Sequence, residues 1–473
     1  MTKVLSVTSE CAPLIKTGGL ADVAGALPAA LADFGVEMRT LLPGYPAVMS
    51  ALKKPETVAE LDGIFGGSAR VLSAKASGLN LLVLDAPHLF DREGSIYLGP
   101  NGQDWPDNPE RFAALSQVAA HIASGLLEGW TPDLVHCHDW QAGLVPYYLK
   151  RDNVGVPSIL TIHNIAFQGV VPMHRAGDLG IAAQDLTADG VEYWGQISAL
   201  KAGLVYADRL TTVSPTYAEE LMTPEFGMGL DGVLRSRRAD LSGILNGIDL
   251  SVWSPEVDEN IQQYKTPRGK AANKKALRAE FGLPDSDGPL CVVVSRLTEQ
   301  KGLDLLLGAL PTLLERGGQL ALLGSGDPGL ESAFQSYDHP NVSVRIGYDE
   351  ALSHRMMAGA DAILVPSRFE PCGLTQLYGL RYGTVPLVAL TGGLADTVIP
   401  HTPATLARQV ATGIQFHPVT QGSLENALSR LCTLFETPKL WSKVQRNAMA
   451  HPVGWESSAA AYAALYTDLG KAA

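Results

Sequence analysis

The sequence predicts an α/β protein that contains two separately wound parallel sheets. Short apolar runs alternate with stretches of helical periodicity along the chain, which is the pattern of parallel strands joined by crossover helices. The alternation stops near Asn246 and resumes at Leu290, after a polar and partly basic stretch. The 473 residues also exceed the roughly 250 to 300 that one hydrophobic core usually covers, so two domains are expected.

The first series contains seven predicted strands. They are residues 4–8, 38–42, 79–84, 134–137, 159–162, 210–213 and 244–245. After the first strand, apolar residues recur at helical spacing from Leu20 to Phe34, which predicts a helix that opens at Gly18 and Gly19. Another helix is expected over residues 109–122.

The second series contains six predicted strands. They are residues 290–294, 320–323, 342–346, 362–365, 385–389 and 414–416. Leucines at helical spacing between 303 and 314 predict the crossover helix between the first two of them. We place the domains at 1–245 and 246–455 and predict a final helix over 456–473, whose packing partner the pattern does not fix.

Composition excludes several classes of protein. With 46% hydrophobic and 18% charged residues, the chain is typical of soluble globular proteins, and no apolar run approaches the ~20 residues of a membrane span. The N-terminus has no basic region followed by an apolar core, so a cytoplasmic location is expected. The net charge of -13 argues against nucleic acid and leaves a neutral polymer allowed. The five cysteines form no CxxC pair, which predicts reduced thiols and no zinc site.

Polar clusters follow nine of the predicted strands. They begin at Lys16, His138, His163, Asn246, Ser295, Gly324, Gly347, Ser367 and Thr391. The carboxyl ends of parallel strands form the ligand-binding edge of an open α/β sheet. We therefore expect the two edges to face each other across one interdomain cleft.

The turn after the first strand is the first candidate ligand cradle. The free amides of a helix that opens at Gly18 and Gly19 can face an anion, and Lys16 stands beside them as a point charge for a phosphate. An ordinary strand-to-helix turn with a solvated lysine explains this stretch alone equally well. The pattern is not GxGxxG, so no dinucleotide site is predicted.

Two clusters of the second series carry candidate catalytic groups. Arg296 and Lys301 follow a strand at a spacing that can direct both cations to one diphosphate, although a solvated pair is the alternative. Glu370 precedes a Pro and a Gly at the start of a new helical pattern, where its carboxylate can accept hydrogen bonds from sugar hydroxyls. The amides around Cys372 to Thr375 offer a phosphate the positive ends of dipoles. The alternative for Glu370 is a helix-capping carboxylate.

Other polar groups favour sugar binding. His163, beside Asn164 at the end of a strand, is interpreted as a sugar contact, with a core histidine as the alternative. The segment from Tyr97 to Phe112 mixes aromatic, amide and acid groups that suit sugar rings, although an ordinary capping loop is also consistent. Asp285-Ser286-Asp287 has the DxD spacing of metal-dependent glycosyl transfer, but it precedes the strand at 290–294 and is rejected as a metal site.

Six motifs together resemble the family of bacterial glycogen synthases and plant starch synthases over nearly the whole chain. The motifs are Lys16-Thr-Gly-Gly-Leu-Ala-Asp22-Val, His136-Cys-His138-Asp139-Trp140, Thr161-Ile-His163-Asn164, Ser295-Arg296-Leu-Thr-Glu-Gln-Lys301-Gly, Ser367-Arg-Phe-Glu370-Pro-Cys372-Gly-Leu-Thr-Gln and Thr391-Gly-Gly-Leu-Ala-Asp396-Thr. The resemblance implies a GT-B fold of two Rossmann-like domains, with the final helix crossing back onto the first. It also implies glucose transfer from ADP-glucose to the non-reducing end of an α-1,4-glucan, with retention of configuration and without a metal or another cofactor.

The resemblance also assigns roles to matching residues. Catalysis is assigned to His163, Arg296, Lys301 and Glu370. Substrate binding is assigned to Lys16, Gly18, Gly19, Asp22, Asp139, Asn246, Cys372, Gly373, Thr391, Gly392, Gly393 and Leu394. Independently of the resemblance, we predict acceptor binding by Tyr97, Asp104, Trp105 and Trp140. A homo-oligomer is left open.

Two positions depart from the pattern of related retaining enzymes. A second acid often stands eight residues after the position of Glu370, but here that residue is Tyr378, so no carboxylate is available there for a ribose. The Gly-Thr-Gly often found before the late strand is Ala411-Thr412-Gly413, which affects a local turn.

Three other classes of protein are alternatives to a glycosyltransferase. A Rossmann oxidoreductase would need GxGxxG and an acid about 20 residues later, and neither domain has that pair. A phosphorylase would need a pyridoxal phosphate lysine. A noncatalytic glucan-binding protein would not need Arg296, Lys301 and Glu370 together, so their joint presence favours catalysis.

Overall fold

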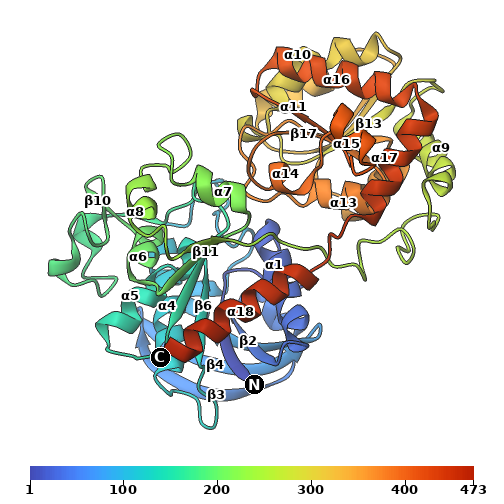
Figure 1. Ribbon diagram of the computed structural model, residues 1–473. Helices are drawn as coiled ribbons and strands as arrows, with labels where there is room; N and C mark the ends of the chain where they lie inside the picture. Colours follow the sequence, from blue (N-terminus) through green and yellow to red (C-terminus); the bar gives the residue numbers. More distant parts are fainter. Residues whose placement is uncertain (473) are drawn as a thin grey trace. The chain divides into compact units, whose positions relative to one another are not determined.

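The computed structural model describes residues 1–472, with side chains through residue 470. Residue 473, the end of the predicted C-terminal helix, lies outside the described residues. The chain forms two compact units (Figure 1). Unit 1 comprises Met1–Asn246 and Trp455–Ala473, and unit 2 comprises Gly247–Gly454.

Unit 1 is built on a nine-stranded sheet of order β12-β11-β7-β6-β1-β2-β5-β4-β3. The strands are β1 (Thr2–Val7), β2 (Val36–Pro43), β3 (Lys53–Ile64), β4 (Gly67–Ala76), β5 (Leu79–Asp85), β6 (Leu134–His138), β7 (Ser158–Ile162), β11 (Arg209–Thr212) and β12 (Leu241–Gly243). All neighbours are parallel except β3 with β4 and β4 with β5. The strand order reverses between β1 and β6, and sheets of this kind bind ligands at such a reversal.

Some strands of unit 1 differ from the prediction. The strand expected at 244–245 lies at Leu241–Gly243, because its partner β11 ends at Thr212 and α7 (Pro215–Glu220) begins soon after. The antiparallel strands β3 and β4 were not predicted. Strand β3 is an edge strand with exposed lysines and a proline near its start, and such edges carry little apolar alternation. A small sheet of β8 (Val170–Pro172), β9 (Glu192–Tyr193) and β10 (Gln196–Ser198) was also missed.

Helix α1 (Gly19–Ala32) follows β1 and buries the apolar face that its spacing predicted. Leu20, Val23, Leu27 and Leu31 are buried, but Phe34 lies beyond the end of the helix and is 46% exposed. The other helices of the first segment are α2 (Pro46–Ala51), α3 (Pro87–Phe90), α4 (Asn108–Ala123), α5 (Leu144–Arg151), α6 (Ala199–Tyr206), α7 and α8 (Asp231–Ser236).

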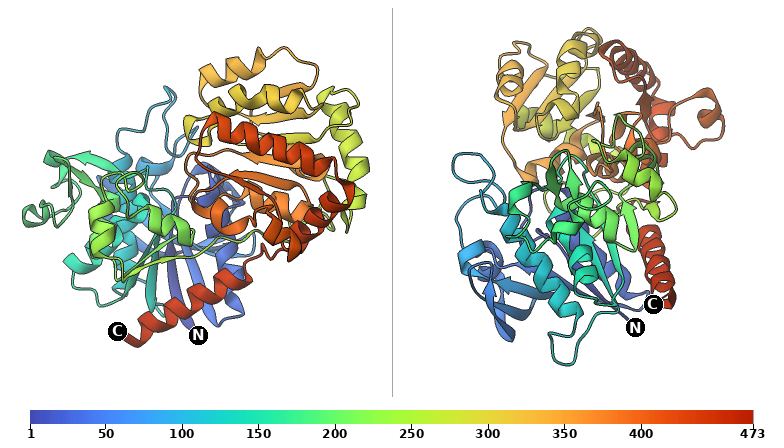
Figure 2. Two further views of the ribbon diagram at one scale, coloured as in Figure 1. Left: turned by 45° about the horizontal axis from the view of Figure 1, so that its top comes forward. Right: turned by 90° about the vertical axis from the view of Figure 1, so that its left-hand side faces the viewer.

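The C-terminal helix α18 (Glu456–Ala472) belongs to unit 1, where it lies along α1 (Figures 1 and 2). Its Tyr462 and Tyr466 are buried in one apolar cluster with Val4, Val23 and Leu27. The Tyr466 hydroxyl also lies 2.8 Å from Nδ1 of the buried His136 in β6. The helix thus covers α1 and the centre of the sheet, which the apolar pattern alone could not specify.

Unit 2 contains a six-stranded parallel sheet of order β15-β14-β13-β16-β17-β18. The strands are β13 (Leu290–Val294), β14 (Gln319–Gly324), β15 (Val342–Ile346), β16 (Ala362–Val365), β17 (Val385–Ala389) and β18 (Ile414–Phe416). One face packs against α10 (Leu303–Leu314) and α16 (Gln421–Phe435), and the other against α9 (Lys270–Phe281), α12 (Glu350–Gly359) and α13 (Thr375–Tyr382). The remaining helices are α11 (Pro328–Gln335), α14 (Gly392–Thr397), α15 (Pro403–Ala407) and α17 (Pro438–Ala450).

The sheet of unit 2 reverses its strand order between β13 and β16. The loops after these two strands carry Arg296 and Lys301 on one side and Glu370 on the other. The predicted α/β class with one large sheet in each unit is confirmed: the unit 2 sheet is parallel throughout, and the nine-stranded sheet of unit 1 is parallel except for the pairings of β4 with β3 and β5.

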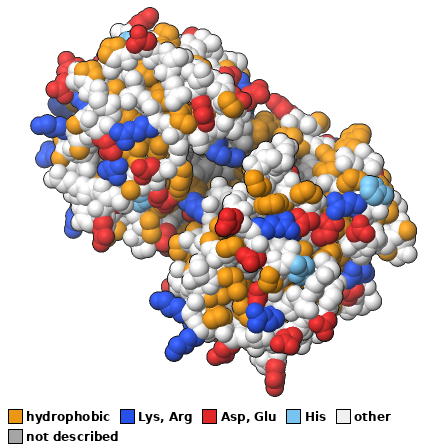
Figure 3. Space-filling model, turned by 180° about the vertical axis from the view of Figure 1, so that it is seen from behind, with side chains coloured by type: hydrophobic (Ala, Val, Ile, Leu, Met, Phe, Trp, Pro, Cys, Tyr) orange, Lys and Arg blue, Asp and Glu red, His pale blue; other side chains and the backbone are white. Residues whose placement is uncertain are grey.

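The surface of the protein fits the composition. On the face drawn in Figure 3, Lys and Arg side chains are interspersed with Asp and Glu side chains. Across residues 1–472, no helix has both the length and the apolar character that crossing a membrane would require.

Candidate functional site

The loop between β1 and α1 brings together the predicted residues Lys16, Gly18, Gly19 and Asp22. Helix α1 starts at Gly19, and Gly18 occupies the cap position with extended backbone and no side-chain cap. A Cβ atom at Gly18 would meet nothing within 4 Å, so the start of the helix is open on that side. The Lys16 ammonium lies 2.8 Å from the Asp22 carboxylate, and these side chains are 30% and 25% exposed.

Glu10 organises this loop and was missed by the sequence interpretation. Its carboxylate accepts hydrogen bonds from the amides of Thr17 and Gly18, from the Thr17 hydroxyl and from the Tyr97 hydroxyl. Burial raises the pKa of Glu10, while the hydrogen bonds from Thr17 and Gly18 oppose that rise. The amides of Thr17 and Gly18 are therefore used within the protein. The sequence feature that could have identified Glu10 is its position between the buried strand β1 and the glycine turn at Gly18.

Asp139 is held at the end of β6 in an unusual backbone conformation. Its φ of 54° and ψ of −167° lie in a region that is almost restricted to glycine, and such strain concentrates at functional sites. Its Oδ1 accepts hydrogen bonds from the backbone amides of His163 (2.6 Å) and Asn164 (3.3 Å), which directly follow the neighbouring strand β7. Burial raises the pKa of Asp139 to about 7, against the effect of these hydrogen bonds. The structure thus joins Asp139 to His163 and Asn164.

Two buried histidines contact each other behind this acid. Nδ1 of His138 lies 3.0 Å from Nε2 of His163, and Nε2 of His138 lies 3.1 Å from the Ser6 hydroxyl. Burial lowers the pKa of His163 and lowers that of His138 to about 3, so both rings are neutral near pH 7. A neutral imidazole has one N–H, so the bond between the rings uses one donor and one acceptor. His163 therefore offers a hydrogen bond, and not a positive charge, to a ligand.

The predicted acceptor residues divide into two places. Tyr97 and Trp140 are linked through Phe112, whose ring centre is 6.0 Å from that of Tyr97 and 5.0 Å from that of Trp140. Trp105 takes no part in these ring contacts, and its indole N–H donates to the Ser95 carbonyl. Asp104 is exposed on the same loop as Trp105.

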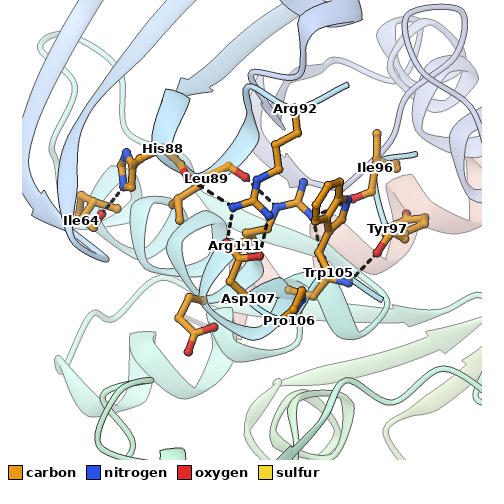
Figure 4. A network of polar contacts seen from close by, with 12 residues as sticks. Ile64, His88, Leu89, Arg92, Ile96, Tyr97, Trp105, Pro106, Asp107 and Arg111 are labelled. Atoms are coloured by element: carbon orange, nitrogen blue, oxygen red, sulfur yellow. Dashed lines mark hydrogen bonds and ion pairs between the residues drawn. The ribbon is translucent and has the colours of Figure 1, made fainter. Parts of the chain in front are cut away.

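Arg111 anchors this loop from the centre of a polar network (Figure 4). Its buried guanidinium donates to the carbonyls of Leu89 and Ile96, each at 2.8 Å. Arg92 pairs with Asp107 on the same loop, and its guanidinium lies 4.9 Å from the Trp105 ring centre. One face of Trp105 is therefore covered by a cation, so this tryptophan stabilises the loop that presents Tyr97.

Asn246 follows the last strand of unit 1. It is 8% exposed, and its Oδ1 has no hydrogen-bond partner among the described residues. A buried polar atom without a partner costs free energy, so its presence at the edge of a sheet points to a ligand hydroxyl or an ordered water.

In unit 2, Lys301 and Glu370 form an ion pair across the reversal of strand order. The Lys301 ammonium lies 2.6 Å from Oε2 of Glu370, and the side chains are 17% and 9% exposed. The Ser367 hydroxyl donates to the same oxygen at 2.8 Å. Arg296 is exposed on the loop after β13. The structure therefore joins two predicted catalytic residues that are 69 positions apart.

The loop from Thr391 to Leu394 packs directly against Glu370 and Cys372. A Cβ atom at Gly392, whose φ is +42°, would lie 2.0 Å from the Glu370 carbonyl oxygen. The Gly393 amide donates to the carbonyls of Glu370 and Pro371. Glycines are needed here because the two loops touch through their backbones. Gly373, with a φ of +73°, ends the Glu370 loop just before α13.

Tyr378 takes a packing position in place of the second acid. Its ring stacks on Trp253 at a centroid distance of 3.7 Å, and His354 stacks on the other face of Trp253 at 3.7 Å. His354 also lies 2.7 Å from the Asp258 carboxylate. These contacts fix the start of unit 2 to α12 and α13.

The rejected DxD motif lies between α9 and β13, before the strand as predicted. Within residues 1–472, no group of three or more His, Cys, Asp or Glu side chains is arranged to hold a metal ion.

The two doubly wound sheets, with cations, acids and glycine turns after their strands, define a glycosyltransferase of the GT-B class. Residues 3–236 match the family model of the starch synthase catalytic domain, and residues 274–448 match that of glycosyl transferases group 1. The chain is 64% identical to the glycogen synthase of Paracoccus denitrificans, with 98% of this chain and 99% of the relative covered. It is 62% identical to the glycogen synthase of Jannaschia sp., over the same shares. The chain belongs to the glycogen and starch synthase family.

Solved structures agree with this placement. The catalytic domain of starch synthase IV from Arabidopsis thaliana, bound to ADP and acarbose, has a TM-score of 0.89 and 31% identity, with 99% of each chain covered. Sucrose-phosphate synthase from Thermosynechococcus elongatus has a TM-score of 0.63 at 20% identity over the whole of both chains, which shows the same fold.

Proposed function

We propose that this protein is a glycogen synthase, which transfers glucose from ADP-glucose to the non-reducing end of an α-1,4-glucan with retention of configuration. The observation that carries the proposal is the Lys301–Glu370 ion pair at the edge of the unit 2 sheet. It combines a cation for a departing phosphate with a carboxylate for a sugar. The high identity to glycogen synthases supports the same reaction.

Lys301 can hold the Glu370 carboxylate beside the glucose and also bind the diphosphate of the donor. An ammonium group has three donors, and the bond to Glu370 uses one of them, which leaves two for diphosphate oxygens. Arg296 on the same loop, the start of α13 near Cys372 and Gly373, and the backbone of Thr391 to Leu394 would supply further positive groups. As the glycosidic bond breaks, negative charge grows on the departing ADP, and these fixed groups would stabilise it.

Glu370 is proposed to orient the glucose and to stabilise positive charge at its anomeric carbon. Ser367 and Lys301 hold its Oε2, which fixes the direction of the carboxylate. A group fixed before the reaction needs no reorganisation in the transition state. No second carboxylate lies beside it in the sequence, so we do not assign it a covalent intermediate.

Unit 1 is proposed to bind the donor through two groups of residues. Lys16, with the turn at Gly18 and Gly19, would meet the donor, and Asp22 would share the ammonium of Lys16. Asp139, His163 and Asn246 would exchange hydrogen bonds with sugar hydroxyls. The unpartnered Oδ1 of Asn246 and the neutral ring of His163 support these roles.

Tyr97 and Trp140 are proposed to contact the acceptor glucan, because aromatic rings pack against the apolar faces of sugars. Asp104 and Trp105 would contribute from the adjoining loop. We propose a cytoplasmic location for the reaction.

The test is to supply glycogen with ADP-glucose, UDP-glucose or GDP-glucose separately and to measure release of each nucleoside diphosphate. We expect ADP release to be fastest by a wide margin, and we expect Glu370→Gln to abolish most of it. If no donor is used, or if UDP-glucose is preferred, the proposed function is wrong.

A further inference from the structure

Trp194 occupies the tip of the β9–β10 hairpin, which projects from unit 1 (Figures 1 and 2). Its side chain is 78% exposed. The φ angles of Trp194 and Gly195 are +50° and +78°, so both central residues of the two-residue turn are left-handed. Such turns favour Asn-Gly or Asp-Gly, and a bulky aromatic side chain is sterically disfavoured at the first position. Trp194 is therefore a locally unfavourable choice for this turn.

Two other hairpins in unit 1 provide a comparison. Ser77 and Gly78 form a similar left-handed pair with a small polar residue in first place. Phe65 and Gly66 form another, but Phe65 is partly buried. Packing can account for Phe65, whereas it cannot account for a tryptophan that is mostly exposed. A turn preference that is broken with little burial of the side chain in return points to a functional role.

Hydrogen bonds from side chains and backbone fix the position of the hairpin. The Lys201 ammonium donates to the carbonyls of Ala188 and Glu192. The Glu192 carboxylate accepts a 2.6 Å hydrogen bond from the amide of Gly195 within the turn. The Tyr193 hydroxyl donates at 2.6 Å to the carbonyl of Met228 on a neighbouring loop. The indole is thus presented on a rigid support, which lowers the entropy cost of binding.

The loop of Met228 and Gly229 approaches one edge of the Trp194 indole. A Cβ atom at Gly229 would lie 2.8 Å from Nε1 of Trp194, so glycine allows the ring to lie against this loop. Met228, the preceding residue, is 38% exposed, and Phe167 nearby in this region is 53% exposed. Gln168 donates to the Met228 carbonyl and connects the two segments. We call Phe167, Gln168, Met228 and Trp194 the hairpin platform.

The hairpin platform contains an unused hydrogen-bond acceptor and adjoins the predicted acceptor residues. Gln168 is 8% exposed, and its Oε1 has no partner among the described residues. The next residue, Gly169, packs on Trp140, because a Cβ atom there would lie 2.2 Å from Cε3 of that ring. The segment of Gln168 and Gly169 therefore contacts both Trp140 and the loop of Met228 and Gly229, against which Trp194 lies.

We propose that the hairpin platform binds a stretch of α-glucan that extends beyond the acceptor end. The identity of this polymer rests on the proposed function. The exposed indole can pack against the apolar face of a glucose ring. The net charge of -13 disfavours a polyanion, whereas a neutral polysaccharide meets no such repulsion.

The variant Trp194→Asn tests the hairpin platform, because asparagine suits the turn and removes only the ring. The control variant is Phe34→Asn, which removes an exposed aromatic ring from the segment between α1 and β2. Binding is measured by retardation in native gels that contain glycogen and no nucleotide sugar. We expect Trp194→Asn to bind glycogen roughly three- to tenfold more weakly, as for loss of one aromatic stacking contact, and the control to match the wild type.

Three further measurements separate a binding role from other roles. The melting temperature of Trp194→Asn should equal or exceed that of the wild type, and its kcat with maltotriose should be unchanged. Equal glycogen affinity in Trp194→Asn and wild type would overturn the inference. So would a lower melting temperature that accounts for the loss, or a wild-type dimer that this substitution dissociates, because the ring would then pack on a second copy.

The gel assay needs no donor, so its result is independent of the proposed reaction. Failure of the proposed function would appear as a wild-type protein that releases no nucleoside diphosphate with any donor.

Discussion

Replacing Lys301 with alanine removes the cation that lies 2.6 Å from the Glu370 carboxylate. The Ser367 hydroxyl then remains as the donor to Oε2 of Glu370. Removing one partner of a fully buried pair costs about 3–5 kcal/mol. Because the Glu370 side chain is 9% exposed and that of Lys301 is 17% exposed, water can partly replace the ammonium. We therefore expect Lys301→Ala to lower the free energy of unfolding by about 2–3 kcal/mol.

A double-mutant cycle isolates the pair from its surroundings. Glu370→Ala should cost less than Lys301→Ala, about 1–2 kcal/mol, because the long side chain of Lys301 can turn toward water. The double variant should be more stable than the sum of the single effects by at least about 1 kcal/mol, as for residues in direct contact.

The same loop offers a matched control. Arg368 and Asp304 are also 2.6 Å apart, but their side chains are 32% and 42% exposed. Exposed pairs of this kind contribute about 0–1 kcal/mol, so the cycle of Arg368→Ala and Asp304→Ala should show a coupling below that of the buried pair. Urea unfolding monitored by tryptophan fluorescence measures both cycles. Equal coupling in the two pairs, or additive effects at Lys301 and Glu370, would refute the reasoning.

The same variants report on the reaction. Glu370→Ala should lower kcat roughly 10²-fold or more, as for loss of a preorganised electrostatic group. The measurement is the rate of ADP release at saturating ADP-glucose and glycogen. A glucosyl ester trapped on Glu370 would contradict the electrostatic role.

Three further predictions concern the donor, pH and metals. Lys16→Gln should weaken the binding of ADP-glucose by about 1.5–3 kcal/mol, measured through KM, and leave the affinity for glycogen unchanged. Asp22→Asn should weaken donor binding less, because the Lys16 ammonium remains. Burial raises the pKa of Asp139 from 3.8 to about 7, so between these pH values the folded protein keeps a proton that the unfolded chain releases. The free energy of unfolding of the wild type relative to Asp139→Asn, measured in urea, should therefore fall as the pH rises from about 4 to about 7. Activity should persist in excess EDTA, whereas Arg296→Ala and Lys301→Ala should each lower kcat without rescue by Mg²⁺; loss of activity on chelation would contradict this.

The central strands could be predicted because both faces of a parallel sheet are covered. Strands β13 and β16 are continuous apolar runs for that reason, and their bounds match the expectation. Strand β3 could not be found in this way, since an edge strand meets water and its sequence is mostly polar. Phe34 continued the helical spacing but lies past the end of α1, because a period does not show where a helix stops.

The edge on which the site residues lie was predictable, but the contacts between them were not. Strand polarity alone puts the residues that follow β13 and β16 at the same edge. Nothing in the spacing shows that Lys301 pairs with Glu370, since the two lie on loops whose approach depends on the packing of Gly302 and Gly392. Glu10 was missed for the same reason, because one of its partners, Tyr97, is 87 positions away.

Strain and unmet polar groups in unit 1 gather in two neighbouring places. At the end of β6, Asp139 combines a disfavoured backbone conformation with a buried carboxyl group, and strain of this kind costs on the order of 1–3 kcal/mol. At the hairpin platform, Trp194 stands in a left-handed turn beside Gln168, which has an unpaired oxygen. The pairing of β6 with β1 and β7 stabilises the backbone at Asp139 in its disfavoured conformation. The hydrogen bonds from Lys201 stabilise the hairpin that carries Trp194. Asp139 accepts two backbone hydrogen bonds and Trp194 lies against Gly229, but the carboxyl group stays buried and the indole stays 78% exposed. Further contacts are therefore expected from a ligand that follows the segment between Trp140 and Trp194.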